Sequence, residues 1–150
     1  MDRMVSIIQA RIGSTRLPGK VLSDLSGKPM LEHVVERVRQ SMRIDGVVVA
    51  TALSPANDAI EEFCSRCGIA CFRGSEDDVL DRYYNAAIKH RADAIVRITS
   101  DCPLVDPFII DEMADFFNSN NYDMVSNFGN ELNLRTYPRG LDVEVFSFGC

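Results

Sequence analysis

The sequence predicts an α/β fold, in which a mainly parallel sheet carries helices on both faces. Short β-branched and apolar runs alternate along the chain with amphipathic stretches of helical spacing. Several runs are apolar throughout, as expected for strands buried on both faces of a parallel sheet. The length of 150 residues suits one domain, 1–150, with a single sizeable core. Strands are predicted over residues 4–10, 46–51, 69–73, 94–99, 123–127 and 142–148.

Four helices are predicted between these strands, each from a start signal and an apolar face. The first begins at Pro29, which suits a first helical position, and the second follows Ser54. The third follows Ser75 and has acids in its first turn, and the fourth begins after Asp106. The side chains expected to face the core are Met30, Leu31, Val34, Val35, Val38, Ile60, Phe63, Cys64, Cys67, Val79, Leu80, Tyr83, Tyr84, Ala87, Ile88, Ile109, Ile110, Met113, Phe116 and Phe117.

The last strand-like run, 142–148, is followed by Cys150 and by no helix that could cover it. Strands of parallel sheets are normally covered on both faces. We therefore expect this chain to be the N-terminal portion of a longer one. The alternative is a natural end on an edge strand.

Composition and charge exclude several classes of protein. The net charge is −6 and the pI about 4.9, whereas a nucleic-acid binder usually presents a basic face. No apolar run is long enough to span a bilayer, and the N-terminus lacks the cationic start and cleavage site of a signal peptide, so we expect a cytoplasmic protein without a membrane partner.

The chain has five cysteines, an odd number, and we expect no disulfide framework. Cys64 and Cys67 are interpreted as core residues, because no second CxxC or His pair completes a zinc site.

A cationic loop, QARIGSTRLPGK (9–20), leaves the first predicted strand. Ligands of open parallel sheets bind beyond the carboxyl ends of the strands. Arg11, Arg16 and Lys20 can neutralise phosphate oxygens, and the glycines Gly13 and Gly19 let the backbone approach a ligand. The loop therefore predicts a phosphate site. The alternative is a solvated loop with incidental cations.

The loop is not a P-loop. That motif places four residues between its first glycine and Gly-Lys, followed by Ser or Thr. Here five residues separate Gly13 from Gly19, and Val21 follows Lys20. Pro18 also lacks the amide donor that a phosphate cradle needs. ATPase or GTPase chemistry of the P-loop kind is excluded on this basis.

The stretches IIQARIGSTRLPGKVL, GKPMLEHVVERV, FRGSEDDVLDRYYNAA, VRITSDCPLVDP and YPRGLDVEVFS resemble, in this order, those of the cytidylyltransferases. The similarity is greatest to the spore coat polysaccharide biosynthesis protein F family, relatives of the CMP-KDO synthetases and acylneuraminate cytidylyltransferases. It covers nearly the whole chain. It implies a Rossmann-like nucleotide-diphospho-sugar transferase fold. It also implies transfer of a nucleotidyl group, with CTP as the expected NTP and Mg²⁺ as cofactor, to a sugar or sugar acid for surface polysaccharide biosynthesis, with release of pyrophosphate.

The resemblance also implies the site. Asp101 would be the magnesium-binding aspartate, since hard oxygen ligands suit Mg²⁺; the alternative is a turn cap before Pro103. A second carboxylate would come from Asp142 or Glu144, which alternate along a strand, unless both belong to a solvated face. The catalytic set is Arg11, Arg16, Lys20 and Asp101, and the nucleotide-binding set adds Gln9, Ala10, Gly13, Ser14, Thr15, Thr99 and Ser100.

The acceptor side is expected to involve Asp81 and Arg82, which align with a Thr-Asp-Arg stretch of the sugar-acid cytidylyltransferases, and Arg139 in the loop 128–141. Asp81 and Arg82 can also be an ordinary exposed helix pair. Thr99 stands where those relatives carry a base-contacting glutamine, so the sequence leaves the NTP open.

Two alternative functions remain open at this point. One is a GT-A glycosyltransferase, although its Asp-x-Asp motif is absent because Cys102 and Pro103 follow Asp101. The other is a non-catalytic nucleotide-binding module. The sequence names neither the sugar nor the oligomeric state, and a homodimer is left open.

Overall fold

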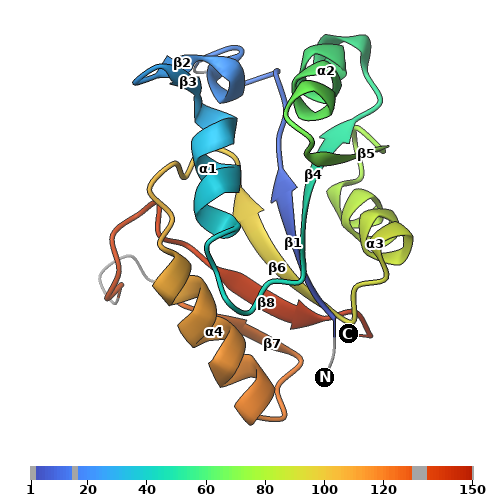
Figure 1. Ribbon diagram of the computed structural model, residues 1–150. Coiled ribbons are helices and arrows are strands. Elements are labelled where there is room, and N and C mark those ends of the chain that lie inside the picture. The colour runs from blue at the N-terminus through green and yellow to red at the C-terminus, as the bar shows by residue number, and fades with distance from the viewer. Residues whose placement is uncertain (1–2, 15–16, 130–134, 150) are drawn as a thin grey trace.

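Within residues 3–14, 17–129 and 135–149, which the computed structural model describes, six strands form one sheet with helices on both faces (Figure 1). The strand order is β5-β4-β1-β6-β8-β7, and a separate two-stranded hairpin pairs β2 with β3. This architecture confirms the predicted fold class. The sheet strands are β1 (Met4–Gln9), β4 (Gly46–Ala52), β5 (Ala70–Gly74), β6 (Ala94–Thr99), β7 (Met124–Ser126) and β8 (Glu144–Ser147).

The sheet is parallel from β5 to β6 and then changes direction. β1 pairs in parallel with β4 and with β6, and β4 pairs in parallel with β5. β8 runs antiparallel to both β6 and β7 and lies between them. Among the described residues the last strand is therefore an interior strand of the sheet, and the alternative edge position is wrong. The carboxyl ends of β1 and β6 share one edge of the sheet, the upper one in Figure 1.

The four predicted helices are present as α1 (Met30–Val38), α2 (Asp58–Arg66), α3 (Val79–His90) and α4 (Pro107–Ser119). The side chain of Asp106 caps α4 as expected, accepting a hydrogen bond from the Phe108 amide at 2.9 Å. Asp78, and not Ser75, caps α3, because the Ser75 hydroxyl accepts a bond from the Asp78 amide one turn earlier. Short elements that the sequence did not predict are the 3-10 turns Lys20–Leu22 and Pro55–Asn57 and the strands β2 (Asp24–Leu25) and β3 (Lys28–Pro29).

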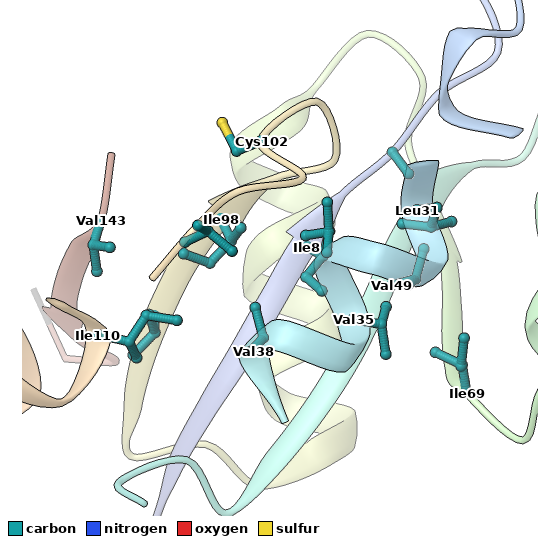
Figure 2. Close-up of a cluster of buried hydrophobic side chains, with 14 of the residues drawn as sticks. Ile8, Leu31, Val35, Val38, Val49, Ile69, Ile98, Cys102, Ile110 and Val143 are labelled. Atoms are coloured by element: carbon teal, nitrogen blue, oxygen red, sulfur yellow. The ribbon is translucent and has the colours of Figure 1, made fainter. Parts of the chain in front are cut away.

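Two buried clusters form the core, one on each face of the sheet. The larger one joins β1, β4 and β6 to α1, α2 and α4, and its centre is shown in Figure 2. The smaller one lies under α3 and includes Ile7, Tyr83 and Ala87. Burial of this apolar area is the main stabilising contribution to the fold. It fixes β1 and β6 side by side, so the segments that leave them must emerge together.

The predicted apolar face of α3 is wrong in part. Leu80, Tyr84 and Ile88 are 77%, 53% and 51% exposed, whereas Ala86 is fully buried and Arg82 is 3% exposed. The helix packs through Tyr83, Ala86 and Ala87, and the two alanines allow a close approach to the sheet. Three more residues that the sequence predicts to face the core are exposed. They are Val79 (39%), Phe116 on α4, which stacks on Tyr122, and Cys67, which lies just past the end of α2.

Candidate active site

A cavity of about 240 Å³, here called the loop cavity, lies where β1 and β6 end. Ligands of open parallel sheets bind at this edge. The cavity brings together predicted residues from two segments that are about ninety positions apart in the sequence, 9–20 and 99–101. Its lining residues are Gln9, Arg11, Ser14, Lys20, Val21, Arg97, Thr99, Ser100 and Asp101.

Backbone pairing explains why the two segments meet. Gln9 and Thr99 are partners in the β1–β6 register, and the Ser100 amide donates to the Gln9 carbonyl at 3.1 Å. The chain therefore leaves β1 and β6 at the same level. Ala10 is buried and its amide donates to Ala50 of β4, so it fixes the start of the loop and does not line the cavity.

The loop after β1 folds back on Ile12. The Ile12 amide donates to Asn57 Oδ1 at 2.9 Å, and its carbonyl accepts from the amides of Ser14 and Gly19 at 2.8 and 2.9 Å. Gly19 has φ +70°, a left-handed conformation that favours glycine, and it starts the 3-10 turn that carries Lys20. Gly13 is exposed and does not line the cavity. The predicted Thr15 and Arg16 lie outside the described residues.

Lys20 and Asp101 form an ion pair at the cavity wall. Lys20 Nζ lies 2.6 Å from Asp101 Oδ2, and the two side chains are 23% and 43% exposed. Burial alone would raise the pKa of Asp101, but hydrogen bonds from Lys20 and Thr99 outweigh it, so the pKa lies below its ordinary value. Asp101 is therefore a carboxylate at neutral pH and can serve as a metal ligand. Arg11 has no hydrogen bond or ion pair to any other described residue.

A second and more open hollow of about 510 Å³, here called the outer hollow, also borders Asp101. It shares Thr99 and Asp101 with the loop cavity and adds Arg139, Asp142, Arg135, Cys102 and Gly140. Arg135 forms an ion pair with Asp142. Arg139 is exposed and, in the part of the chain that the structure describes, has no ionic or hydrogen-bonded partner. The predicted acceptor residue Arg139 is thus available beside Asp101.

The two carboxylates suggested as additional metal ligands are both paired with arginines. Asp142 binds Arg135, and Glu144 binds Arg97 directly across the β6–β8 register. Among the described residues, no group of three or more His, Cys, Asp or Glu side chains could hold a metal ion. Mg²⁺ commonly binds one or two carboxylates together with substrate phosphates and water. Asp101 fits that kind of site, and of the two additional candidates Asp142 is the one that lines the outer hollow with it.

Arg97 is a cavity residue that the sequence reasoning missed. Besides its ion pair with Glu144, its charge acts on nearby Tyr83, whose hydroxyl donates to the Ile7 carbonyl at 3.4 Å. Burial raises the pKa of Tyr83 to about 12, so this phenol stays neutral. Arg97 is the one charged residue in the strand AIVRIT, and a charge is costly to bury. This feature of the sequence could have indicated a functional or paired arginine.

The predicted acceptor residues Asp81 and Arg82 line neither the loop cavity nor the outer hollow. The Asp81 carboxylate accepts a hydrogen bond from Asn85 within α3. Arg82 is buried, donates to the Ser75 carbonyl at 2.6 Å, and has an Nε atom without a partner among the described residues. Burial lowers its pKa, and nearby Arg11 lowers it further. The interpretation as an exposed pair is therefore wrong for Arg82, and the acceptor role of both residues stays a prediction.

Comparison with known protein families gives a match over most of the chain. Residues 5–138 match a family described as Cytidylyltransferase. The spore coat polysaccharide biosynthesis protein SpsF of Bacillus subtilis is 41% identical over 133 residues, which are 85% of this chain and 55% of that protein. The 3-deoxy-manno-octulosonate cytidylyltransferase of Geobacter metallireducens is 36% identical over 73% of this chain and 42% of that protein. This chain therefore spans about half the length of these relatives.

Solved structures give the same result for the fold. A cytidylyltransferase from Leptospira borgpetersenii superimposes with a TM-score of 0.90 at 38% sequence identity. The superposition covers 99% of this chain and 62% of that one. The sheet order and the edge that carries the loop cavity therefore belong to an architecture already seen in a cytidylyltransferase.

No helix in the described part of the chain is long and apolar enough to cross a membrane.

Proposed function

Because the chain belongs to the cytidylyltransferase family, we propose that its site transfers the CMP group of CTP to a sugar acid and releases pyrophosphate. The observation that carries the proposal is the meeting of Lys20, Arg11 and Asp101 at one cavity, since a triphosphate with its metal needs both cations and a carboxylate. The names of the relatives favour surface polysaccharide biosynthesis as the setting.

The triphosphate would lie along the loop after β1. Arg11 can hold two phosphate oxygens with parallel N–H groups, and Lys20 supplies a compact positive charge. Arg16, in the same loop, is proposed as a third cation. Gln9 and Thr99 line the cavity on paired strands and would contact the nucleoside part. Phosphoryl-type transfer needs little covalent help, so positioning and charge neutralisation would supply most of the rate.

Mg²⁺ is the proposed cofactor, and Asp101 would hold it. When bound, the ion would neutralise charge that develops on the phosphate oxygens. Lys20 and Asp101 both line the loop cavity. Lys20 could therefore leave its ion pair with Asp101 and bind a phosphate oxygen instead. The chain's own contribution is thus to hold the phosphates from one side and to present a carboxylate from the other.

The acceptor would occupy the outer hollow. In an in-line displacement the attacking oxygen approaches opposite the leaving pyrophosphate. If the loop holds the leaving phosphates, that approach is from the β6–β8 side of Asp101, where the outer hollow lies. Arg139 could pair with an acceptor carboxylate there, which favours a sugar acid over a neutral sugar.

The test is pyrophosphate release from CTP and Mg²⁺ with a panel of sugar acids that includes 3-deoxy-manno-octulosonate. We expect release with at least one sugar acid. Arg139→Gln should raise the KM for that acceptor about 10- to 100-fold, because a charge-assisted hydrogen bond contributes about 1.5–3 kcal/mol, while the KM for CTP stays unchanged. Arg66→Gln, a change of an exposed arginine on α2, is the matched control.

Two results would contradict the proposal. Consumption of a supplied CMP-sugar without pyrophosphate would indicate a glycosyltransferase. Binding of CTP without turnover for every acceptor in the panel would indicate a nucleotide-binding module.

A further inference from the structure

Among the described residues, the two carboxylates that line the loop cavity and the outer hollow are each paired with a cation, and so is Glu144, the partner of the cavity residue Arg97. Asp101 binds Lys20, Asp142 binds Arg135 and Glu144 binds Arg97. Arg11 and Arg139 line the same two spaces and have no anionic partner within the described residues. The local charge is therefore positive on a chain whose net charge is −6. Such a site attracts a triphosphate and repels a free divalent cation.

A metal ion on Asp101 Oδ2 would compete with Lys20 for that oxygen. Lys20 Nζ lies 2.6 Å from Oδ2, whereas Mg²⁺ needs a carboxylate oxygen at about 2.0–2.1 Å. An ammonium group and a divalent cation repel each other at that separation, so the ion can reach this oxygen only if Lys20 moves. The other carboxylate oxygen, Oδ1, lies 4.0 Å from Cys102 Sγ.

A triphosphate changes this balance. Phosphate oxygens in the loop cavity offer Lys20 a replacement partner, and they also supply further ligands for the metal. Displacement of Lys20 then costs little, because its charge remains compensated. Without the triphosphate, the same displacement leaves the partly buried ammonium group without a partner.

From these contacts we propose that Lys20 is a built-in counter-ion which keeps divalent metal off Asp101 until a nucleoside triphosphate arrives. This inference rests on the proposed nucleotide site and specifies its ligand: the site selects the metal–triphosphate complex over the free metal ion. Metal and nucleotide therefore bind with strong positive coupling, and Lys20 is one source of that coupling.

Mn²⁺ is a suitable probe, because its electron paramagnetic resonance signal reports the free ion directly. Titrations with and without CTP should show that CTP tightens Mn²⁺ binding to the wild-type chain at least tenfold. Lys20→Met should tighten binding of Mn²⁺ alone about threefold to tenfold and should reduce the coupling with CTP. Lys28→Met is the matched control, since Lys28 forms an equally short ion pair with Glu36 on α1. Asp101→Asn should abolish Mn²⁺ binding at this site in the wild-type chain and in the Lys20→Met chain.

Wild-type and Lys20→Met chains that bind Mn²⁺ alone with equal affinity would overturn the inference. Equal Mn²⁺ affinity of the wild type with and without CTP would overturn it as well. Failure of CTP to bind at all would instead contradict the proposed function, and the effect of Lys20→Met on Mn²⁺ alone would still decide the inference. Thermal unfolding of each variant verifies that the fold is intact.

Discussion

Asp101→Asn is expected to lower the rate of pyrophosphate release from CTP by about 10²–10³-fold, the usual loss when one electrostatic contact to a transition state is removed. The amide has the shape of the carboxylate but no charge, so it can neither hold Mg²⁺ well nor pair with Lys20. The side chain is 43% exposed, so its ion pair contributes little to stability, and the unfolding free energy should change by less than about 1 kcal/mol.

The measurement is steady-state pyrophosphate release over a range of Mg²⁺ concentrations, with thermal unfolding of the same samples. Asp123→Asn is the control, since Asp123 is an exposed aspartate that precedes β7. An Asp101→Asn chain with the wild-type rate and Mg²⁺ dependence would show that the metal is held elsewhere.

Ile8→Ala is expected to destabilise the chain by about 2–5 kcal/mol, the cost of a large-to-small change in a packed core. Ile8 is fully buried on β1 and packs in the cluster beneath α1 that Figure 2 shows. The loss has two parts, the transfer of the missing methyl groups and the cavity that remains. Because β1 also carries the loop with Arg11 and Lys20, the same change should loosen the loop cavity.

Urea unfolding followed by circular dichroism measures this effect. Leu80→Ala is the matched comparison, because Leu80 is 77% exposed on α3 and its loss should change stability by no more than about 0.5 kcal/mol. Equal losses for the two variants would contradict the packing described here and would support the α3 face that the sequence alone predicts.

Much of the fold follows from local sequence. The β-branched runs locate the strands, and a capping aspartate at 106 locates the start of α4. The shared edge of the site follows as well, since the carboxyl ends of neighbouring parallel strands must meet. That rule alone predicts that the loop after β1 lies close to Asp101, which follows β6. In the structure, Nζ of Lys20 in this loop lies 2.6 Å from Oδ2 of Asp101.

Other features depend on contacts between distant segments and could not be predicted locally. α3 has apolar residues on more than one side, so periodicity alone could not choose between Leu80 and Ala86 as its buried residue. The insertion of β8 between β6 and β7 is set by pairing across the sheet, and no property of residues 144–147 indicates its direction. Arg97 lies beside Glu144 and Tyr83 only in the folded chain, since these residues are distant from it in the sequence.

The most direct test of the account is a crystal structure of the chain with CTP and Mg²⁺. We expect the triphosphate in the loop cavity, with Arg11 and Lys20 on its oxygens and Mg²⁺ on Asp101, and with Lys20 moved away from the carboxylate. A nucleotide bound at another surface, with the Lys20–Asp101 ion pair intact, would contradict the account.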